Sequence, residues 1–145
     1  MNPTFTFNRI LVGVEESEDA LKAFHYAVHR ATLEKAKLIL ALIIEEEDIN
    51  SFEILSKSFI KEERQKLMVQ AKKYRQYALD QGVSDVEVLI GQGNPGEVIV
   101  KELIPQAKAD LLIIGAKSKK SLSHYFGTQA SYMAKNATIS VLVIR

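Results

Sequence analysis

Residues 10–17 read Ile-Leu-Val-Gly-Val-Glu-Glu-Ser, and this stretch decides the fold. Its first part, Ile10–Val14, is apolar and β-branched, which is typical of a buried strand. Ser17 is a good N-cap, and acidic residues follow it where a helix dipole favours negative charge. Apolar side chains then recur at helical spacing, which predicts an amphipathic helix from Ser17 to about Leu33. A buried strand leading straight into such a helix is the first half of a β-α-β unit.

The same alternation continues to the C-terminus. The further predicted strands are Lys37–Ile44, Val86–Ile90, Leu111–Ile114 and Ile139–Ile144. The further predicted helices run from Ile60 to a stop at Gly82, from Pro95 to Pro105 and from Gly127-Thr128 to Asn136, and Gly91–Gly96 is predicted as a turn. We therefore expect an α/β fold with one domain over residues 1–145. It is an open, doubly wound, five-stranded parallel sheet of order 3-2-1-4-5 with helices on both faces.

Composition limits the class of protein. The chain has 145 residues, 47% of them hydrophobic and 26% charged, which is typical of a globular domain. It has no cysteine, which rules out disulfides and thiolate metal sites. Met1–Asn8 has no signal-peptide pattern, and the apolar run Leu38–Ile44 is too short to span a bilayer. The net charge of +1 gives no support for nucleic-acid binding, so we expect a cytoplasmic protein with neither a membrane nor a nucleic-acid partner.

A ligand site is expected where the strand order reverses, between the first and fourth strands. The loops that follow these strands are Glu15–Ser17 and Gly115–Thr128. The second loop has glycine near both ends, three lysines, and a helix start whose N–H groups favour anions. Such a loop could hold a polyphosphate. These residues could equally have structural roles alone. Gly115 would then end a strand, Gly127-Thr128 would cap a helix, and the lysines would belong to a solvent-exposed loop.

Other chemistry finds little support. His25 and His29 share a face of the first predicted helix, but no third ligand is evident, so we expect no metal site. No Ser-His-Asp or Cys-His pattern is present, and we expect no catalytic residue. A slow ATPase or nucleotide hydrolase stays open as an alternative, with His124 or Glu15 as the candidate base.

Several motifs in order resemble one known family. They are Val14-Glu15-Glu16-Ser17, Gly93-Asn94-Pro95, the run Ala109–Gly115, the helix Gly127–Ala137 and the closing Val141–Ile144. In this order, the chain resembles the universal stress proteins over nearly its whole length. The resemblance implies a five-stranded sheet, a role in surviving stress, and a homodimer through the last strand, Ile139–Arg145. An apolar strand at a sheet edge, with unpaired backbone groups, agrees with such pairing.

Some universal stress proteins bind ATP and others do not. The binders share a loop of Gly, two residues, Gly, nine residues, then Gly and Ser or Thr, and an Asp after the first strand. Here Ser118 stands where the second Gly is expected, eight residues separate it from Gly127, and Glu15 replaces the Asp. Two readings stay open: a dimeric stress-response regulator that binds ATP or a related adenine nucleotide, or the same dimer without nucleotide, acting through protein partners.

The resemblance also implies roles for individual residues. On the nucleoside side it places Gly13, Val14 and Glu15, and Ile44 is the expected adenine contact. The residues expected at the phosphates are Gly115, Ser118, Gly127 and Thr128. Any Mg²⁺ is expected on the phosphates and not in a protein cage.

Overall fold

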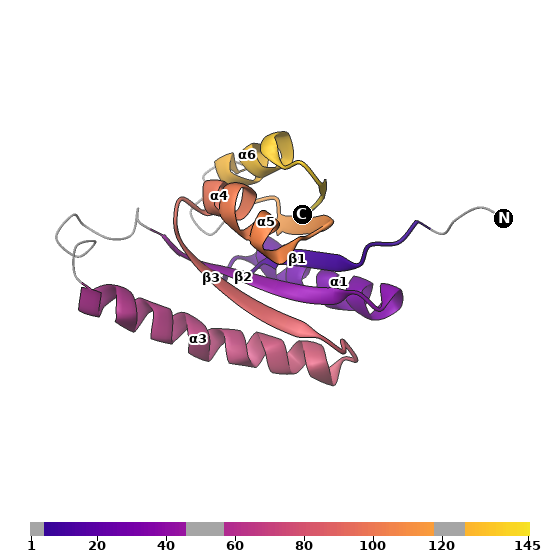
Figure 1. The fold of residues 1–145 in the computed structure, drawn as a ribbon, viewed down its shortest axis with the longest axis horizontal. Helices are drawn as coiled ribbons and strands as arrows, with labels where there is room; N and C mark the ends of the chain where they lie inside the picture. The colour runs from indigo at the N-terminus through magenta and orange to yellow at the C-terminus, as the bar shows by residue number, and fades with distance from the viewer. Residues whose placement is uncertain (1–4, 46–56, 118–126) are drawn as a thin grey trace.

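The computed structural model describes residues 5–45, 57–117 and 127–145. Its centre is a parallel sheet of five strands in the order β3-β2-β1-β4-β5 (Figure 1). The strands are β1 (Arg9–Gly13), β2 (Lys37–Glu45), β3 (Val86–Gly93), β4 (Leu111–Gly115) and β5 (Ser140–Ile144). The predicted sheet order is confirmed, and β1 pairs directly with β4 at the point where the order reverses.

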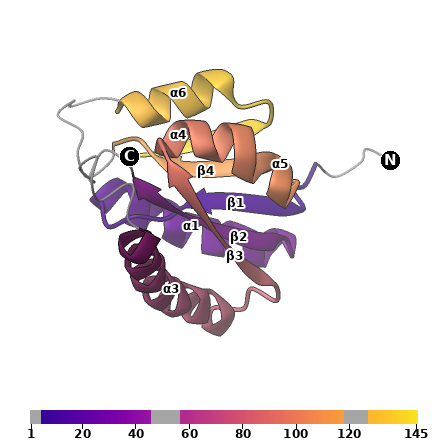
Figure 2. The same ribbon diagram turned by 60° about the vertical axis from the view of Figure 1, so that its left-hand side comes forward.

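Helices cover both faces of the sheet, as predicted (Figure 2). One face carries α1 (Glu18–Glu34) and α3 (Lys57–Asp80). The other carries α6 (Thr128–Asn136) and a continuous helical stretch that divides into α4 (Pro95–Val98), a π-helical turn η2 (Ile99–Leu103) and α5 (Ile104–Ala107). Each face has its own hydrophobic core.

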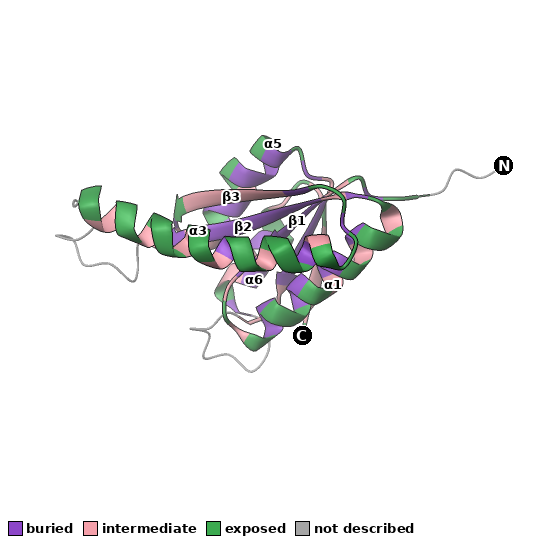
Figure 3. Cartoon of the chain, turned by 90° about the horizontal axis from the view of Figure 1, so that it is seen from below, coloured by how far each residue is buried: buried purple, intermediate pink, exposed green. Residues whose placement is uncertain are grey.

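Successive residues of a central strand enter opposite cores. Ile10 and Val12 pack on the side of Phe24 in α1, whereas Leu11 packs on the side of Ile99 in η2. Because both faces are buried, β1 is apolar at consecutive positions and does not alternate with polar residues. Figure 3 shows the buried residues concentrated in the sheet, while the outer surface of α3 is exposed.

The predicted start of the first helix is confirmed. The Ser17 hydroxyl oxygen accepts a hydrogen bond from the Ala20 N–H at 3.2 Å, and Ser17 has extended backbone angles. The helix ends at Lys35, which adopts a left-handed conformation with φ of 54°. Gly82 likewise follows the end of α3 with φ of 107°, as expected of a C-terminal glycine stop, although α3 begins at Lys57 and not at Ile60.

Two further boundary predictions are wrong. The segment Gly91–Gly96 is not one turn, because β3 continues to Gly93 and pairs with the end of β2. Glycine is needed at Gly91, where a Cβ would lie 2.5 Å from a methyl carbon of Val98. The third helix also does not stop at Pro105.

The helix passes Pro105 because the turn before it is wide. Proline has no N–H and its ring crowds the preceding turn, so it normally breaks an α-helix. Here η2 precedes it, and the Ile104 N–H donates to the Ile99 oxygen five residues back. This π-helical turn accommodates the proline, and helical structure continues to Ala107.

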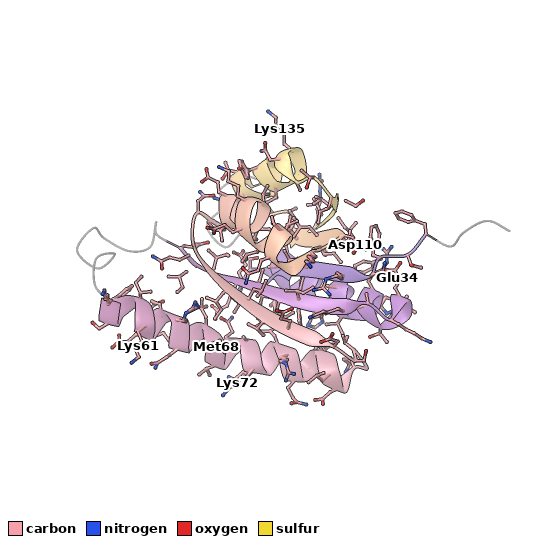
Figure 4. All side chains as sticks on the ribbon, in the orientation of Figure 1. Glu34, Lys61, Met68, Lys72, Asp110 and Lys135 are labelled. Carbon is pink, nitrogen blue, oxygen red and sulfur yellow. The ribbon has the colours of Figure 1, made fainter. Side chains whose placement is uncertain are left out.

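At the amino ends of the strands, two carboxylates hold the segment before β1. Asp110 accepts hydrogen bonds from the backbone N–H groups of Asn8 and Arg9, each at 2.9 Å. Glu34 accepts from the Phe7 N–H at 3.3 Å. Figure 4 shows both acidic residues at the end of the molecule where the N-terminal segment enters. These contacts lie at the opposite end of the sheet from the loops after β1 and β4.

In the ranges that the structure describes, no helix combines the length and apolarity needed to cross a membrane.

Candidate functional site

A cavity of about 90 Å³ opens at the carboxyl ends of β1 and β4. This is the position where open α/β sheets bind ligands, because the two strands send their following loops to opposite faces. Most of its wall is apolar or glycine. Those residues are Gly13, Val14, Ala20, Ala41, Ile43, Pro95, Ile99, Ile114, Gly115, Ala130 and Met133. Four polar side chains complete it: Glu15, Glu45, Lys117 and Gln129.

Four of the residues predicted for the site line this cavity. They are Gly13 at the end of β1, Val14 and Glu15 just after it, and Gly115 at the end of β4. A Cβ built on Gly13 would lie 3.7 Å from the Ile99 side chain and 3.8 Å from that of Ile114, which are ordinary contacts. The absence of a side chain at Gly13 therefore leaves space in the cavity that the fold itself does not require.

Ile44, the expected adenine contact, belongs to the strand that forms one wall of this cavity. Ile43 and Glu45 line it, and Ile44 does not. Side chains alternate along a strand, and β2 continues as a strand through Glu45. Ile44 therefore points to the same face as Leu42, which belongs to the core beneath α1 and α3. The alternation was visible in the sequence, but which face holds the cavity was not.

Gly115 is required by helix packing. A Cβ there would lie 2.7 Å from the Ala20 nitrogen and 2.7 Å from the Asp19 carbonyl carbon. Backbone atoms at that distance cannot yield without moving α1. The glycine thus permits the first turn of α1 to approach the end of β4, and the cavity lies at this contact.

Asp19 helps to shape this site, although no local pattern in the sequence singles it out. Its side chain is buried, with 8% relative exposure, and a carboxylate oxygen accepts from the Lys117 N–H at 3.1 Å. The bond joins the first turn of α1 to the chain just beyond β4. From local sequence alone, Asp19 is one of the acidic residues in the first turn of a helix, and its partner is 98 residues away in the chain.

The start of α6 lies beside the cavity. The Gly127 N–H donates to the Ala116 oxygen at 2.8 Å, so the two ends of the loop after β4 are joined. Gly127 occupies the N-cap position of α6 without a side-chain cap, and Gln129 and Ala130 line the cavity. Among the described residues, Gly127 and Thr128 are not part of the lining. Ser118, the other predicted phosphate contact, lies outside the described residues.

The two histidines of α1 lie away from this site. His25 stacks on Tyr77 of α3, with ring centroids 5.2 Å apart and an angle of 24° between the rings. His29 lies beside Tyr26, at 6.2 Å. Within residues 5–45, 57–117 and 127–145, no group of three or more His, Asp or Glu side chains could hold a metal ion.

The sequence model of the universal stress protein family matches residues 6–145. The chain belongs to this family. Its members share the fold described above, and the predicted resemblance is confirmed.

Related proteins are similar to this universal stress protein in sequence or in structure along nearly its whole length. A relative from Staphylococcus aureus strain USA300, which carries the universal stress protein name, is 28% identical over 141 residues, covering 97% of this chain and 85% of the relative. Universal stress protein UspA from Lactobacillus plantarum has a TM-score of 0.83 at 23% identity, covering 98% of this chain and all of its own. A universal stress protein in complex with cAMP has a TM-score of 0.72 at 23% identity, covering 97% and 99%.

The ATP-binding pattern of the family has an Asp after the first strand. This universal stress protein has Glu15 there, which keeps the carboxylate on a side chain that is one methylene longer. Glu15 is one of the residues that line the cavity. A second carboxylate, that of Glu45, comes from the end of β2. The described lining therefore combines two carboxylates with one lysine, and its remaining surface is largely apolar.

Proposed function

We propose that this universal stress protein binds an adenine nucleotide in the cavity at the carboxyl ends of β1 and β4, and acts as a non-enzymatic, dimeric regulator in the cytoplasm. The observation that carries the proposal is the cavity itself. It lies at the topological switch point, and Gly13 keeps it open although the fold would accept a larger residue. The family resemblance and the cAMP complex of a related protein support the choice of ligand.

The chemistry of the lining suits a nucleoside. Apolar side chains from several elements, among them Ile43, Ile99 and Met133, provide surface for a planar base. The carboxylates of Glu15 and Glu45 can accept hydrogen bonds from ribose hydroxyls or from an amino group. Lys117 supplies positive charge, and the start of α6, whose N-cap Gly127 carries no side chain, can direct N–H groups toward an anion.

In this proposal the phosphates extend toward Gly127 and Thr128. ATP is the ligand that the family pattern favours, and any Mg²⁺ is carried by the phosphates. Calorimetric titration of ATP, AMP and cAMP, with and without Mg²⁺, tests the proposal. Saturable one-to-one binding, weakened by Gly127→Asp, is the expected result. If none of the three nucleotides produces heat or a thermal shift at millimolar concentration, the cavity does not bind nucleotide.

The homodimer is proposed on the geometry of β5. Within the described part of the chain, this strand lies at the edge of the sheet, and its one paired neighbour is β4. The Ile144 oxygen accepts from the Ala116 N–H at 2.7 Å and thus faces the chain that follows β4. Backbone groups alternate in direction along a strand, so the N–H and C=O of Val143 face outward. A second copy of β5 can pair with them around a two-fold axis.

A second candidate keeps the dimer and omits the nucleotide, so that the protein acts through protein partners. Ser118 in place of glycine, and eight residues between it and Gly127, favour this alternative. A slow ATPase is a third candidate, with His124 or Glu15 as its base. Phosphate release that continues in a variant lacking both side chains would eliminate that assignment.

A further inference from the structure

One lining residue of the cavity also joins two helices. Gln129 is the second residue of α6, and its side-chain oxygen Oε1 accepts a hydrogen bond from the Gly96 N–H at 2.8 Å. Gly96 is the second residue of α4. The side chain therefore spans from the start of one helix to the start of another, at the wall of the cavity.

The start of α4 needs this contact. The first N–H groups of a helix have no acceptor within the helix. Asn94 accepts from the Glu97 N–H at 3.3 Å, and Gln129 accepts from the Gly96 N–H. A Cβ at Gly96 would lie 2.7 Å from Gln129 Oε1 and 3.0 Å from a ring carbon of Tyr132, so a side chain there would displace the end of Gln129 from its present position.

The contact fixes the orientation of the Gln129 amide. A backbone N–H can donate only to the oxygen of the amide, and so the oxygen faces Gly96. The amide is planar, and its NH₂ group therefore lies on the other arm. Among the described lining residues, Gln129 carries the one uncharged side-chain donor, whereas Glu15 and Glu45 carry acceptors.

We infer that Gln129 determines the ligand specificity of the cavity by donating a hydrogen bond from its amide nitrogen to an uncharged acceptor of the nucleoside, either a ring nitrogen or a sugar oxygen. This inference rests on the proposed nucleotide binding. It adds that recognition of the nucleoside part depends on an α6 side chain and is independent of the number of phosphates. If Gln129 only capped α4, its amide nitrogen would have no effect on binding.

Two substitutions separate the cap from the donor. Gln129→Glu keeps an oxygen for the Gly96 N–H and removes the NH₂ group. Gln129→Met keeps the length of the side chain and removes both the oxygen and the NH₂ group. Adenosine is the first ligand, because it has no charge that the new carboxylate could repel. Ser131→Glu, at an exposed position on the same helix, is the control for an added negative charge.

The expected result is a loss of adenosine affinity of about five- to tenfold in both Gln129 variants, the value of one hydrogen bond, and no loss in the control. Gln129→Met lowers the affinity for AMP and ATP by the same factor. Its melting temperature falls, while that of Gln129→Glu stays near the native value because the cap is retained.

Analogues that each lack one acceptor identify the partner atom: 1-deaza-, 3-deaza-, 7-deaza-, 2′-deoxy- and 3′-deoxyadenosine. One of them should bind the native protein weakly, and Gln129→Met should not weaken it further. The inference is overturned if Gln129→Glu binds adenosine with native affinity. It is also overturned if Gln129→Met lowers the affinity for every analogue by the same factor by which it lowers the affinity for adenosine. If the native protein binds neither adenosine nor any nucleotide, the proposed function is overturned together with the inference. Titration of the native protein is therefore done first, because it separates this outcome from a failure of the inference alone.

Discussion

Gly13 and Gly115 both line the cavity, and replacing each with alanine should have opposite consequences. Alanine at Gly13 places a methyl group 3.7 and 3.8 Å from its nearest neighbours, which is ordinary van der Waals contact. Alanine at Gly115 places it 2.7 Å from two backbone atoms of α1. One substitution fills the cavity, and the other displaces a helix.

The difference in stability follows from these distances. A contact of 2.7 Å is shorter than the normal carbon contact, and relieving it requires α1 to shift. Overpacking of this kind costs about 1–3 kcal/mol. Gly13→Ala avoids that cost and lowers the entropy of the unfolded chain, which stabilises the fold by about 0.4–1 kcal/mol. We therefore expect the two variants to differ by roughly 1.5–4 kcal/mol in their free energy of unfolding.

Urea unfolding measures the stabilities, and calorimetry with adenosine and ATP measures binding. We expect Gly13→Ala to unfold at or above the native midpoint, yet to bind the ligand more weakly because the methyl group occupies the cavity. We expect Gly115→Ala to unfold at a lower urea concentration. Equal stability of Gly115→Ala and the native protein would refute the close approach of α1 to β4. Undiminished binding by folded Gly13→Ala would refute this cavity as the ligand site.

Three further predictions test other parts of the structure. Val143→Pro removes an outward N–H from the edge of β5, so light scattering should find a monomer, and a dimer of native stability would contradict pairing through this strand. Ile44→Ala should lower the free energy of unfolding by about 2–5 kcal/mol in a denaturant titration, because it empties buried space, while ligand affinity stays unchanged. Ile43→Ala should reduce the affinity in calorimetry. If Ile44→Ala reduced the ligand affinity and Ile43→Ala did not, the side chains of β2 would alternate in the opposite sense. Asp110→Ala leaves two backbone N–H groups without their acceptor, and should cost about 1–3 kcal/mol in thermal or urea unfolding. An unchanged midpoint would show that this carboxylate does not hold the N-terminal segment.

Much of the fold could be predicted from the sequence because its signals are local. The apolar run before Ser17, the cap itself and the glycine stop at Gly82 each depend on residues a few positions apart, and all three are confirmed. The errors arose where packing overrode a local rule. Pro105 is a helix breaker by itself, but the π-helical turn before it accommodates the ring.

The site could be predicted only in part. The strand order indicates which loops meet, so the positions of Glu15 and Gly115 on the cavity wall followed from chain order, whereas Gly13 was implied by the family resemblance. The choice between Ile43 and Ile44 did not, because strand alternation gives two faces without saying which one holds the cavity. Whether the predicted phosphate contacts bind a ligand stays a prediction.

The sequence by itself determined the element types, the sheet order and the family, because these depend on periodicity and motif order along the chain. Only the tertiary structure decided what the glycines are for: space in the cavity at Gly13, and contact with α1 at Gly115. It also brought Asp19 to Lys117 and Gln129 to Gly96. Such pairs are far apart in the chain, and a hydrogen bond between them exists only when separate helices and strands are packed at fixed distances.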